Sequence, residues 1–206
     1  ADHVVMNRII FPGAGYLELA RAAGSAASPA AAALRSVFFL QPLAIETDGL
    51  YVECDVADGS FEVRSGGADA ASVHCSGELV HVAGEWRRVE HASVRALCCE
   101  RAADVGALYD GFHAAGLQYG PGYRTLDRVW GGGSRSVTAR LRARPTQQGT
   151  HVHPADLDDA LCVSAVAAHG DGGETRLPFA VDDARLQSAA GELWAGVELD
   201  EPAESA

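Results

Sequence analysis

Apolar and polar residues alternate along several short stretches of this chain, and glycine-rich turns separate those stretches. The clearest example is near the C-terminus, where Leu193, Ala195, Val197 and Leu199 occupy every second position and so fall on one face. This alternation is typical of an antiparallel strand with one buried face. On the same grounds we predict strands over residues 34–45, 50–56, 60–64, 72–83, 124–130, 136–143, 177–186 and 192–199.

Three other segments repeat apolar residues every three or four positions, which is typical of a helix with one apolar face. The first begins at Pro12, and we expect it to end at Gly24, because proline suits a first helical turn and glycine suits a helix end. The second covers residues 102–115 and ends at Gly116. The third covers residues 154–168 and again opens with proline.

The first and third helices follow similar sequence, in which strand-like residues lead through a proline into an apolar-faced helix. Two α+β halves, each with a sheet packed on its own helix, account for this weak repeat. We place the two halves at residues 1–100 and 101–206. The pattern by itself predicts no more than a two-part α+β domain.

Composition is that of a globular protein. The chain has 206 residues, of which 48% are hydrophobic, so it can bury a core and is too apolar to be disordered. No stretch approaches the roughly 18 consecutive apolar residues of a membrane-spanning helix, and the start does not resemble a signal peptide. Because the chain begins with Ala1 and not with methionine, we expect it to be a segment of a longer polypeptide.

Charge and cysteine usage narrow the class further. The net charge is −12, from 28 acidic and 16 basic residues, and all the basic residues are arginine. An acidic surface repels phosphate backbones, which argues against nucleic-acid binding. The five cysteines are an odd number and form no CxxC pair, so we expect reduced thiols in a cytoplasmic protein.

His3 is the first candidate for chemistry. It lies shortly before Pro12 and a glycine-containing helix start, where exposed backbone N–H groups can stabilise an oxyanion. A histidine beside such a site can act as a general base near neutral pH. Taken alone, the local pattern favours the simpler alternative, a surface or core histidine near a chain end.

Asp158 is the second candidate. On the predicted third helix it shares a face with Cys162, and we expect the neighbouring Leu157 and Leu161 to face the core. A carboxyl group in an apolar cleft has a raised pKa and can donate a proton. Taken alone, the pattern again favours the simpler alternative, an acid in the first helical turn that the helix dipole stabilises.

Asp156 and Asp159 flank this candidate on the same helix. For these two residues we keep the simpler interpretation, that they are first-turn acids without a part in chemistry.

Two further groups of residues have weaker claims. His151 and His153 lie on one face of an extended segment and could form half of a metal site, but no third ligand has a suitable spacing, so we expect no metal. Residues 119–123 (YGPGY) form an aromatic turn whose simplest role is to cap the core.

Four motifs together resemble those of dehydratase domains in bacterial modular type I polyketide synthases. Residues 3–20 (HVVMNRIIFPGAGYLELA) are similar to the family's HxxxGxxxxP motif and the helix after it. Residues 116–123 (GLQYGPGY) are similar to GYxYGPxF, and residues 153–162 (HPADLDDALC) to HPxxxDxxxQ/H. Residues 177–179 (LPF) match the start of LPFxW. The motifs occur in the family's order, and the resemblance covers essentially the whole chain.

The resemblance implies a double-hotdog fold of the α+β class, with two antiparallel sheets that each wrap around a central helix. In that fold the first half would carry His3 and the second half Asp158, and both would face one substrate tunnel. The family's domains are longer at both ends, so we expect strands before His3 and after Leu199 to be missing from this chain.

The resemblance also implies a reaction, the elimination of water from a 3-hydroxyacyl thioester by a hydro-lyase. His3 would remove a proton from C2, the Gly13 amide would polarise the thioester carbonyl, and Asp158 would protonate the leaving C3 hydroxyl. The implied substrate-binding residues are Gly13, Leu117, Tyr119, Pro121 and Cys162.

The implied partners are an acyl carrier protein, whose phosphopantetheine holds the substrate, and the neighbouring synthase domains. A homodimer within the synthase is expected. The mechanism needs no metal or organic cofactor, since one acid and one base suffice.

The sequence departs from the family motifs at several positions. Asn7 replaces a glycine, and asparagine tolerates positive φ well enough for the turn to form. Leu117 replaces a tyrosine, Val181 a tryptophan, and Cys162 the glutamine or histidine that holds the catalytic aspartate. A thiol is a weak hydrogen-bonding group. These changes keep two alternatives open: double-bond migration or closure of a cyclic ether on the same fold, and a silent scaffold domain.

Overall fold

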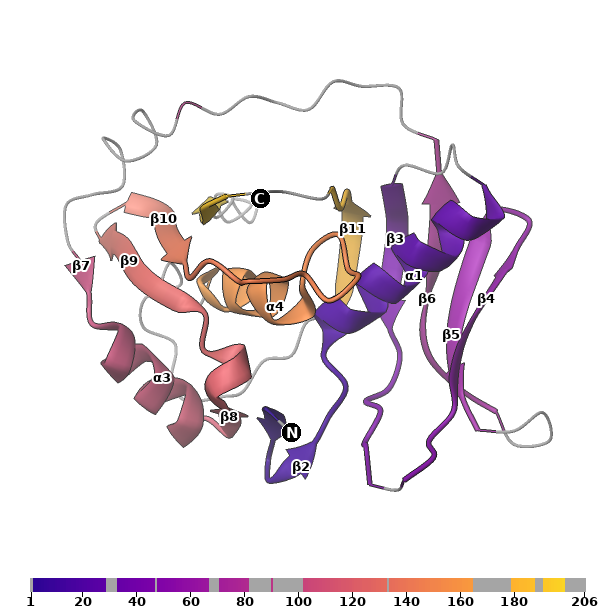
Figure 1. The fold of residues 1–206 in the computed structure, drawn as a ribbon, viewed down its shortest axis with the longest axis horizontal. Helices are drawn as coiled ribbons and strands as arrows, with labels where there is room; N and C mark the ends of the chain where they lie inside the picture. The colour runs from indigo at the N-terminus through magenta and orange to yellow at the C-terminus, as the bar shows by residue number, and fades with distance from the viewer. Residues whose placement is uncertain are drawn as a thin grey trace, which may run out of the picture.

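The computed structural model describes residues 2–28, 33–46, 48–66, 71–81, 90, 102–132, 134–164, 179–187 and 191–198. Within them the chain forms antiparallel sheets with helices packed against one face, which confirms the predicted α+β class. Figure 1 shows the two larger sheets toward opposite ends of the molecule, with α4 (Pro154–Cys162) between them and α1 (Gly13–Ala27) running across the sheet that contains β3. None of the described helices is long and apolar enough to cross a membrane.

The larger sheet packs against α1 and has the strand order β11-β3-β6-β5-β4. Tyr16 and Leu17 of the helix meet Leu34, Phe61 and Val63 of the sheet in one buried core. Burying a large apolar side chain of this kind contributes about 1.5–3 kcal/mol to folding. The strands are β3 (Ala33–Phe39), β4 (Val52–Ala57), β5 (Ser60–Ser65), β6 (Ser72–Val80) and β11 (Ala180–Ala184).

The smaller sheet packs against α4 and α3 (Val105–Ala114) and has the order β12-β10-β9-β7. Tyr109 and Phe112 of α3 join Leu126 and Val137 in its core. The strands are β7 (Ala102–Ala103), β9 (Leu126–Gly132), β10 (Ser134–Leu141) and β12 (Leu193–Glu198).

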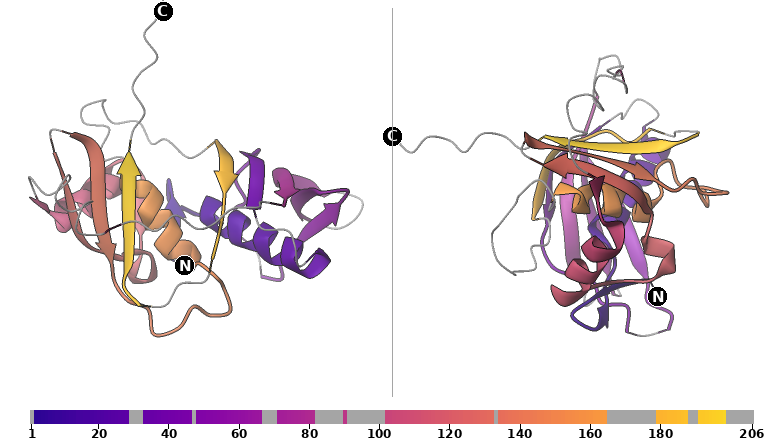
Figure 2. Two further views of the ribbon diagram at one scale, coloured as in Figure 1. Left: turned by 90° about the horizontal axis from the view of Figure 1, so that it is seen from above. Right: turned by 90° about the vertical axis from the view of Figure 1, so that its left-hand side faces the viewer.

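The last two strands of the chain join different sheets. Figure 2 shows β12 beside the strands of the smaller sheet and β11 in the larger one, and the pairing confirms β12 with β10 and β11 with β3. In β12, Ala195 is buried and Leu193 and Val197 pack against the same core, so the predicted alternation is confirmed there. Leu199 lies outside the described residues, as does the predicted boundary between the halves at residues 100 and 101.

A third, small sheet joins the two halves of the sequence. Its order is β2-β1-β8, formed by β1 (His3–Val5), β2 (Arg8–Ile9) and β8 (Leu117–Tyr119). The turn between β1 and β2 has φ of 48° at Met6 and 63° at Asn7. The expectation that asparagine supports this turn is therefore confirmed, because asparagine adopts positive φ more readily than most residues.

Three of the predicted helix ends need correction. Helix α1 continues past Gly24 to Ala27, and Gly24 packs so closely that a Cβ there would lie 2.5 Å from Leu79 Cδ2. Helix α3 begins at Val105, because the Asp104 side chain accepts hydrogen bonds from the first-turn amides. Its predicted end at Gly116 is confirmed, since that glycine has a φ of 88°. Helix α4 ends at Cys162, before the predicted end, and residues 165–168 of the predicted helix lie outside the described residues.

Candidate active site

His3 is buried on β1, and its hydrogen bonds fix the state of its ring. Nδ1 lies 2.7 Å from the carbonyl oxygen of Ile10. Because a carbonyl oxygen can only accept, Nδ1 carries the proton, and Nε2 keeps a lone pair when the ring is neutral. The backbone N–H of Ile10 also donates to the carbonyl of His3 at 3.2 Å, so two bonds hold the histidine near the start of α1.

Asp158 faces this histidine from α4. The distance from His3 Nε2 to Asp158 Oδ2 is 3.6 Å, and both side chains are largely buried. Within the described residues Oδ2 has no hydrogen-bond partner. Burial raises the pKa of the Asp158 carboxyl, and the charge of His3 and a hydrogen bond from Tyr119 oppose that rise. The protonated form of Asp158 is thus favoured relative to an exposed aspartate.

Two tyrosines form an aromatic wall beside the pair. The ring of His3 lies 5.7 Å from that of Tyr119 and 5.3 Å from that of Tyr123, and the two tyrosine rings are nearly parallel. Tyr119 reaches this place because it pairs with His3 across β1 and β8. Burial, then the charge of Asp158, raises the pKa of Tyr123 to about 12, so its hydroxyl stays protonated. The sequence motif contained Tyr123, but only the folded structure reveals the contact of its ring with His3.

Cys162 extends the same group of side chains. Its sulfur lies 3.2 Å from the hydroxyl of Tyr119. The described hydrogen bond of Cys162 is thus to Tyr119 and not to Asp158. Burial, followed by the charge of Asp158, raises the pKa of the thiol to about 12. Cys162 is therefore a neutral, weak hydrogen-bonding group at this position.

The remaining predicted binding residues lie around this centre. Gly13 is the first residue of α1 after Pro12, where helix geometry leaves backbone N–H groups without intrahelical partners. Leu117 lies on β8 and packs against the core of the smaller sheet. Pro121 begins the short 3₁₀ helix η1 (Pro121–Tyr123) and is exposed, so it shapes the turn that carries Tyr123.

Of the two neighbouring acids, Asp156 lies in the first turn of α4 as predicted, whereas Asp159 lies beyond that turn, and both are buried. Asp159 is fully buried, and Asp156 is nearly so. Asp156 accepts a hydrogen bond at 2.7 Å from Nε of Arg144, which also donates to the carbonyl of Gly122. Leu161, which we expected to face the core, is 40% exposed. These partners come from distant parts of the chain, which a local pattern does not reveal.

The two histidines considered for a metal site have other contacts. His153 caps α4, with Nδ1 accepting a hydrogen bond from the backbone N–H of Ala155 at 3.2 Å. Burial, and then the charge of Arg144, lowers the pKa of His153. His151 is exposed and donates its backbone N–H to Glu18 at 2.6 Å. Among the described residues no group of three or more His, Cys, Asp or Glu side chains could hold a metal ion.

The candidate motif at residues 177–179 is only partly visible. Leu177 and Pro178 lie outside the described residues, whereas Phe179 is exposed and contacts Phe38 edge to face. Val181, the position of the family's tryptophan, lies on β11 and packs against the core of the larger sheet.

Family profiles match most of the chain. The profile described as "Polyketide synthase dehydratase domain" matches residues 1–66, and the one described as "Polyketide synthase dehydratase N-terminal domain" matches residues 87–206. Polyketide synthase ThaG of Burkholderia thailandensis is 35% identical over 95% of the chain. The chain spans only 4% of the length of that relative.

Solved structures show the same fold. A trans-AT polyketide synthase dehydratase domain from Brevibacillus brevis superposes with a TM-score of 0.83 at 25% identity, covering 100% of this chain and 78% of that one. The dehydratase domain from the CurF module of curacin polyketide synthase has a TM-score of 0.83 at 21% identity, covering 98% of this chain and 78% of the other. The predicted double-hotdog fold is therefore confirmed.

Proposed function

This chain belongs to the family of polyketide synthase dehydratase domains, and from that premise we propose that it removes water from a 3-hydroxyacyl thioester. The product is an α,β-unsaturated thioester. The observation that carries the proposal is the placement of His3 Nε2 3.6 Å from Asp158 Oδ2. The two groups come from different halves of the sequence, and a scaffold domain has no need to bring them together.

His3 acts as the base in this proposal. The N–H at Nδ1 donates a hydrogen bond to the Ile10 carbonyl, so the lone pair lies on Nε2, the nitrogen that faces Asp158. Nε2 removes a proton from C2, and the electrons of the broken C–H bond form the new double bond between C2 and C3. The hydrogen bond to the Ile10 carbonyl holds the ring in place while its charge changes.

Asp158 acts as the acid. Burial favours its protonated form, and Oδ2 has no other described partner to compete for that proton. As the C3–O bond breaks, the hydroxyl takes the proton from Asp158 and leaves as water. His3 is then protonated and Asp158 ionised, and their 3.6 Å separation supports direct return of the proton to the acid.

Stabilisation of the developing charge on the thioester oxygen is assigned to the start of α1. Backbone N–H groups at a helix N-terminus carry partial positive charge and point away from the helix. Gly13 is the first residue there, and the bonds between His3 and Ile10 tie the base to the segment that leads into this turn. The amide of Gly13 thereby makes the C2 proton more acidic. Tyr119, in contact with the His3 ring, helps to place the C3 hydroxyl.

We also propose that the substrate arrives on the phosphopantetheine of an acyl carrier protein within a larger synthase. The chain's likeness to a small part of polyketide synthase ThaG supports this. His3 and Asp158 supply both the acid and the base, so the elimination as proposed needs no further cofactor.

Product analysis tests the proposal. The purified chain is incubated with a 3-hydroxyacyl thioester that also bears a distal hydroxyl, and the products are separated and weighed by mass spectrometry. The expected product is the α,β-unsaturated thioester, which is about 18 mass units lighter than the substrate because one water is lost. A cyclic ether or a shifted double bond would assign the chain to a second reaction on the same site. Recovery of unchanged substrate would leave a scaffold role.

A further inference from the structure

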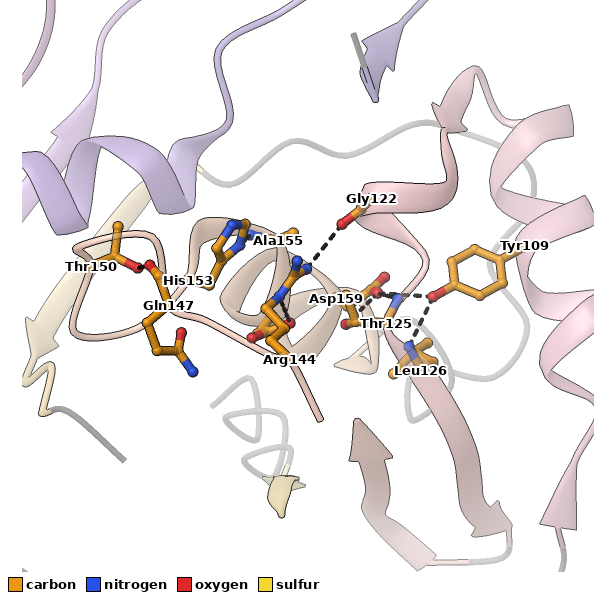
Figure 3. A network of polar contacts seen from close by, with 11 residues as sticks. Tyr109, Gly122, Thr125, Leu126, Arg144, Gln147, Thr150, His153, Ala155 and Asp159 are labelled. Atoms are coloured by element: carbon orange, nitrogen blue, oxygen red, sulfur yellow. Dashed lines mark hydrogen bonds and ion pairs between the residues drawn. The ribbon is translucent and has the colours of Figure 1, made fainter. Parts of the chain in front are cut away.

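Asp159, next to the proposed acid, has an unusual environment for a charged residue. Its carboxylate is completely buried, and Oδ2 accepts hydrogen bonds from the Tyr109 hydroxyl at 2.8 Å and the Thr125 hydroxyl at 2.7 Å. The backbone N–H of Thr125 donates to the same oxygen at 2.5 Å. Tyr109 in turn accepts from the backbone N–H of Leu126 at 3.1 Å. Figure 3 shows this cluster on one side of α4.

We propose that Asp159 is a positioning residue for the elimination, and that its negative charge keeps the proton on Asp158. The inference rests on the proposed function. Asp159 bonds to Tyr109 and Thr125, whereas His3 lies against Asp158, so Asp159 acts through its neighbour on the helix.

The hydrogen bonds around Asp159 join several elements of the fold. Asp159 links α4 to α3 through Tyr109 and to the start of β9 through Thr125 and Leu126. That segment directly follows β8 and η1, which carry the two tyrosines against His3. The cluster therefore fixes the helix that carries Asp158 relative to the strand that pairs with β1. A misplacement of about 1 Å between reacting groups can cost as much as 100-fold in rate.

Asp158 and Asp159 are adjacent carboxyl groups that differ in the hydrogen bonds they receive. Burial raises the pKa of both, and the neighbouring Asp158 charge adds to the rise at Asp159. Three hydrogen bonds converge on Oδ2 of Asp159, whereas Asp158 receives one, from Tyr119. Hydrogen bonds to a carboxylate stabilise its ionised form. When only one of the two carboxyls is protonated, the proton therefore resides on Asp158, where the reaction needs it.

Other titratable groups also face Asp158 and Asp159, and some of them oppose the protonation of Asp158. His3 and Tyr119 act on Asp158 from β1 and β8, and both favour its ionised form. Charged and titratable groups also surround the two carboxyls and their partners: Tyr123 of η1, Cys162 of α4, Tyr109 of α3, Arg124 over the Tyr109 ring, Arg142 after β10, Asp2, and the Arg144–Asp156 pair.

The test compares the wild type with Asp159→Asn, which keeps the shape and an acceptor oxygen but removes the charge. Titration of the Asp158 carboxyl by ¹³C NMR gives a readout that does not depend on turnover. Its midpoint is expected to fall by roughly one pH unit in the variant, the size for two like charges at close range. The matched control is Asp183→Asn, an exposed aspartate paired with Arg35 on the surface, which should leave the midpoint unchanged.

Kinetics on the same proteins complete the test. We expect Asp159→Asn to lower kcat by roughly 10- to 100-fold with little change in KM, and to move the alkaline limb of the kcat profile to lower pH. An unchanged midpoint together with an unchanged kcat in a folded variant would overturn the proposal. If the wild type itself forms no alkene, the proposed function fails, while the NMR midpoint still decides whether Asp159 acts on Asp158.

A milder variant covers the case in which Asp159→Asn does not fold. Tyr109→Phe removes one donor from Asp159 and leaves both Thr125 bonds in place. A lower kcat in folded Tyr109→Phe, with KM and the circular dichroism spectrum unchanged, would support the positioning role. A wild-type kcat in that variant would contradict it.

Discussion

In the proposed reaction, His3 and Asp158 have different tasks because their surroundings differ. The histidine has one nitrogen tied to the Ile10 carbonyl, which leaves the other free to accept a proton. The aspartate is buried without a described partner for Oδ2, which favours the form that can donate one. Separated tasks of this kind allow acid and base catalysis at a single pH.

The pH profile of the wild type is the first prediction at this scale. Asp158 must be protonated to donate, and burial raises its pKa, so turnover should persist above the ordinary range of an aspartate, around pH 4. Activity should then fall as the pH rises through the raised value. Initial rates of alkene formation at saturating substrate would check this. Activity that increases steadily with pH would show that the ionised carboxyl is the working form.

The contact between Cys162 and Tyr119 gives the second prediction. In Cys162→Gln the side-chain amide can donate a stronger hydrogen bond than the thiol to Tyr119 or Asp158. For a simple dehydratase we expect elimination to be equal or faster, with alkene as the sole product. Cys162→Ala is the control that removes the thiol without adding an amide. A cyclic ether from the wild type that gives way to free alkene in Cys162→Gln would favour the ring-closing alternative.

At the scale of single elements, α4 is held at its start and along its length. His153 caps the first turn, Asp156 pairs with Arg144, and Asp159 binds Tyr109 and Thr125. The helix that presents the proposed acid is thereby tied to three other parts of the chain.

The cap gives a prediction about stability. Because the pKa of His153 is lowered in the folded protein, by burial and then by Arg144, folding favours the neutral ring. Its contribution is complete above the unfolded value of about 6.5 and is lost as the pH falls through the lowered folded value. His153→Asn should keep the cap and remove this pH dependence, whereas His153→Ala should cost about 1 kcal/mol at neutral pH. Urea unfolding at pH 7 and pH 5 would check both; an identical pH dependence in all three proteins would contradict the assignment.

The accuracy of the sequence predictions also depends on the element. The sequence predicts longer strands such as β5 and β12 near their observed bounds, because the alternation of apolar and polar residues extends over several positions. The strands β1 and β8 have three residues each, too few to show a period, and their pairing places His3 beside Tyr119. The sequence does not predict the hydrogen bonds of Asp159, because its partners lie far away in the sequence and only folding brings them together.

At the scale of the whole molecule, the site depends on contacts between the two halves of the sequence. The pairing of β1 with β8 is one of them, and the contact between α1 and the segment before α4 is another. In the latter, buried Glu18 binds Arg21 through both oxygens and accepts the backbone N–H of His151. This carboxylate joins the proposed oxyanion helix to the segment that leads into the helix of the proposed acid.

Glu18→Ala should therefore destabilise the molecule. It leaves the largely buried Arg21 without its partner, which typically costs about 3 kcal/mol or more. The control is Glu46→Ala, which breaks the exposed pair with Arg8 and should cost less than about 1 kcal/mol. Urea unfolding of the two variants measures the difference. Equal and small losses would show that Glu18 does not join the halves as described.

The central claim, that His3 is the base and Asp158 the acid, is tested most directly by exchange of the C2 proton in deuterated water. Each protein is incubated with a 3-hydroxyacyl thioester, and mass spectrometry follows deuterium at C2 and the formation of alkene together. We predict that Asp158→Asn still exchanges the proton but loses elimination by about 10²- to 10⁴-fold, whereas His3→Ala loses both. Exchange at the wild-type rate in His3→Ala would contradict the account, because another group would then be the base.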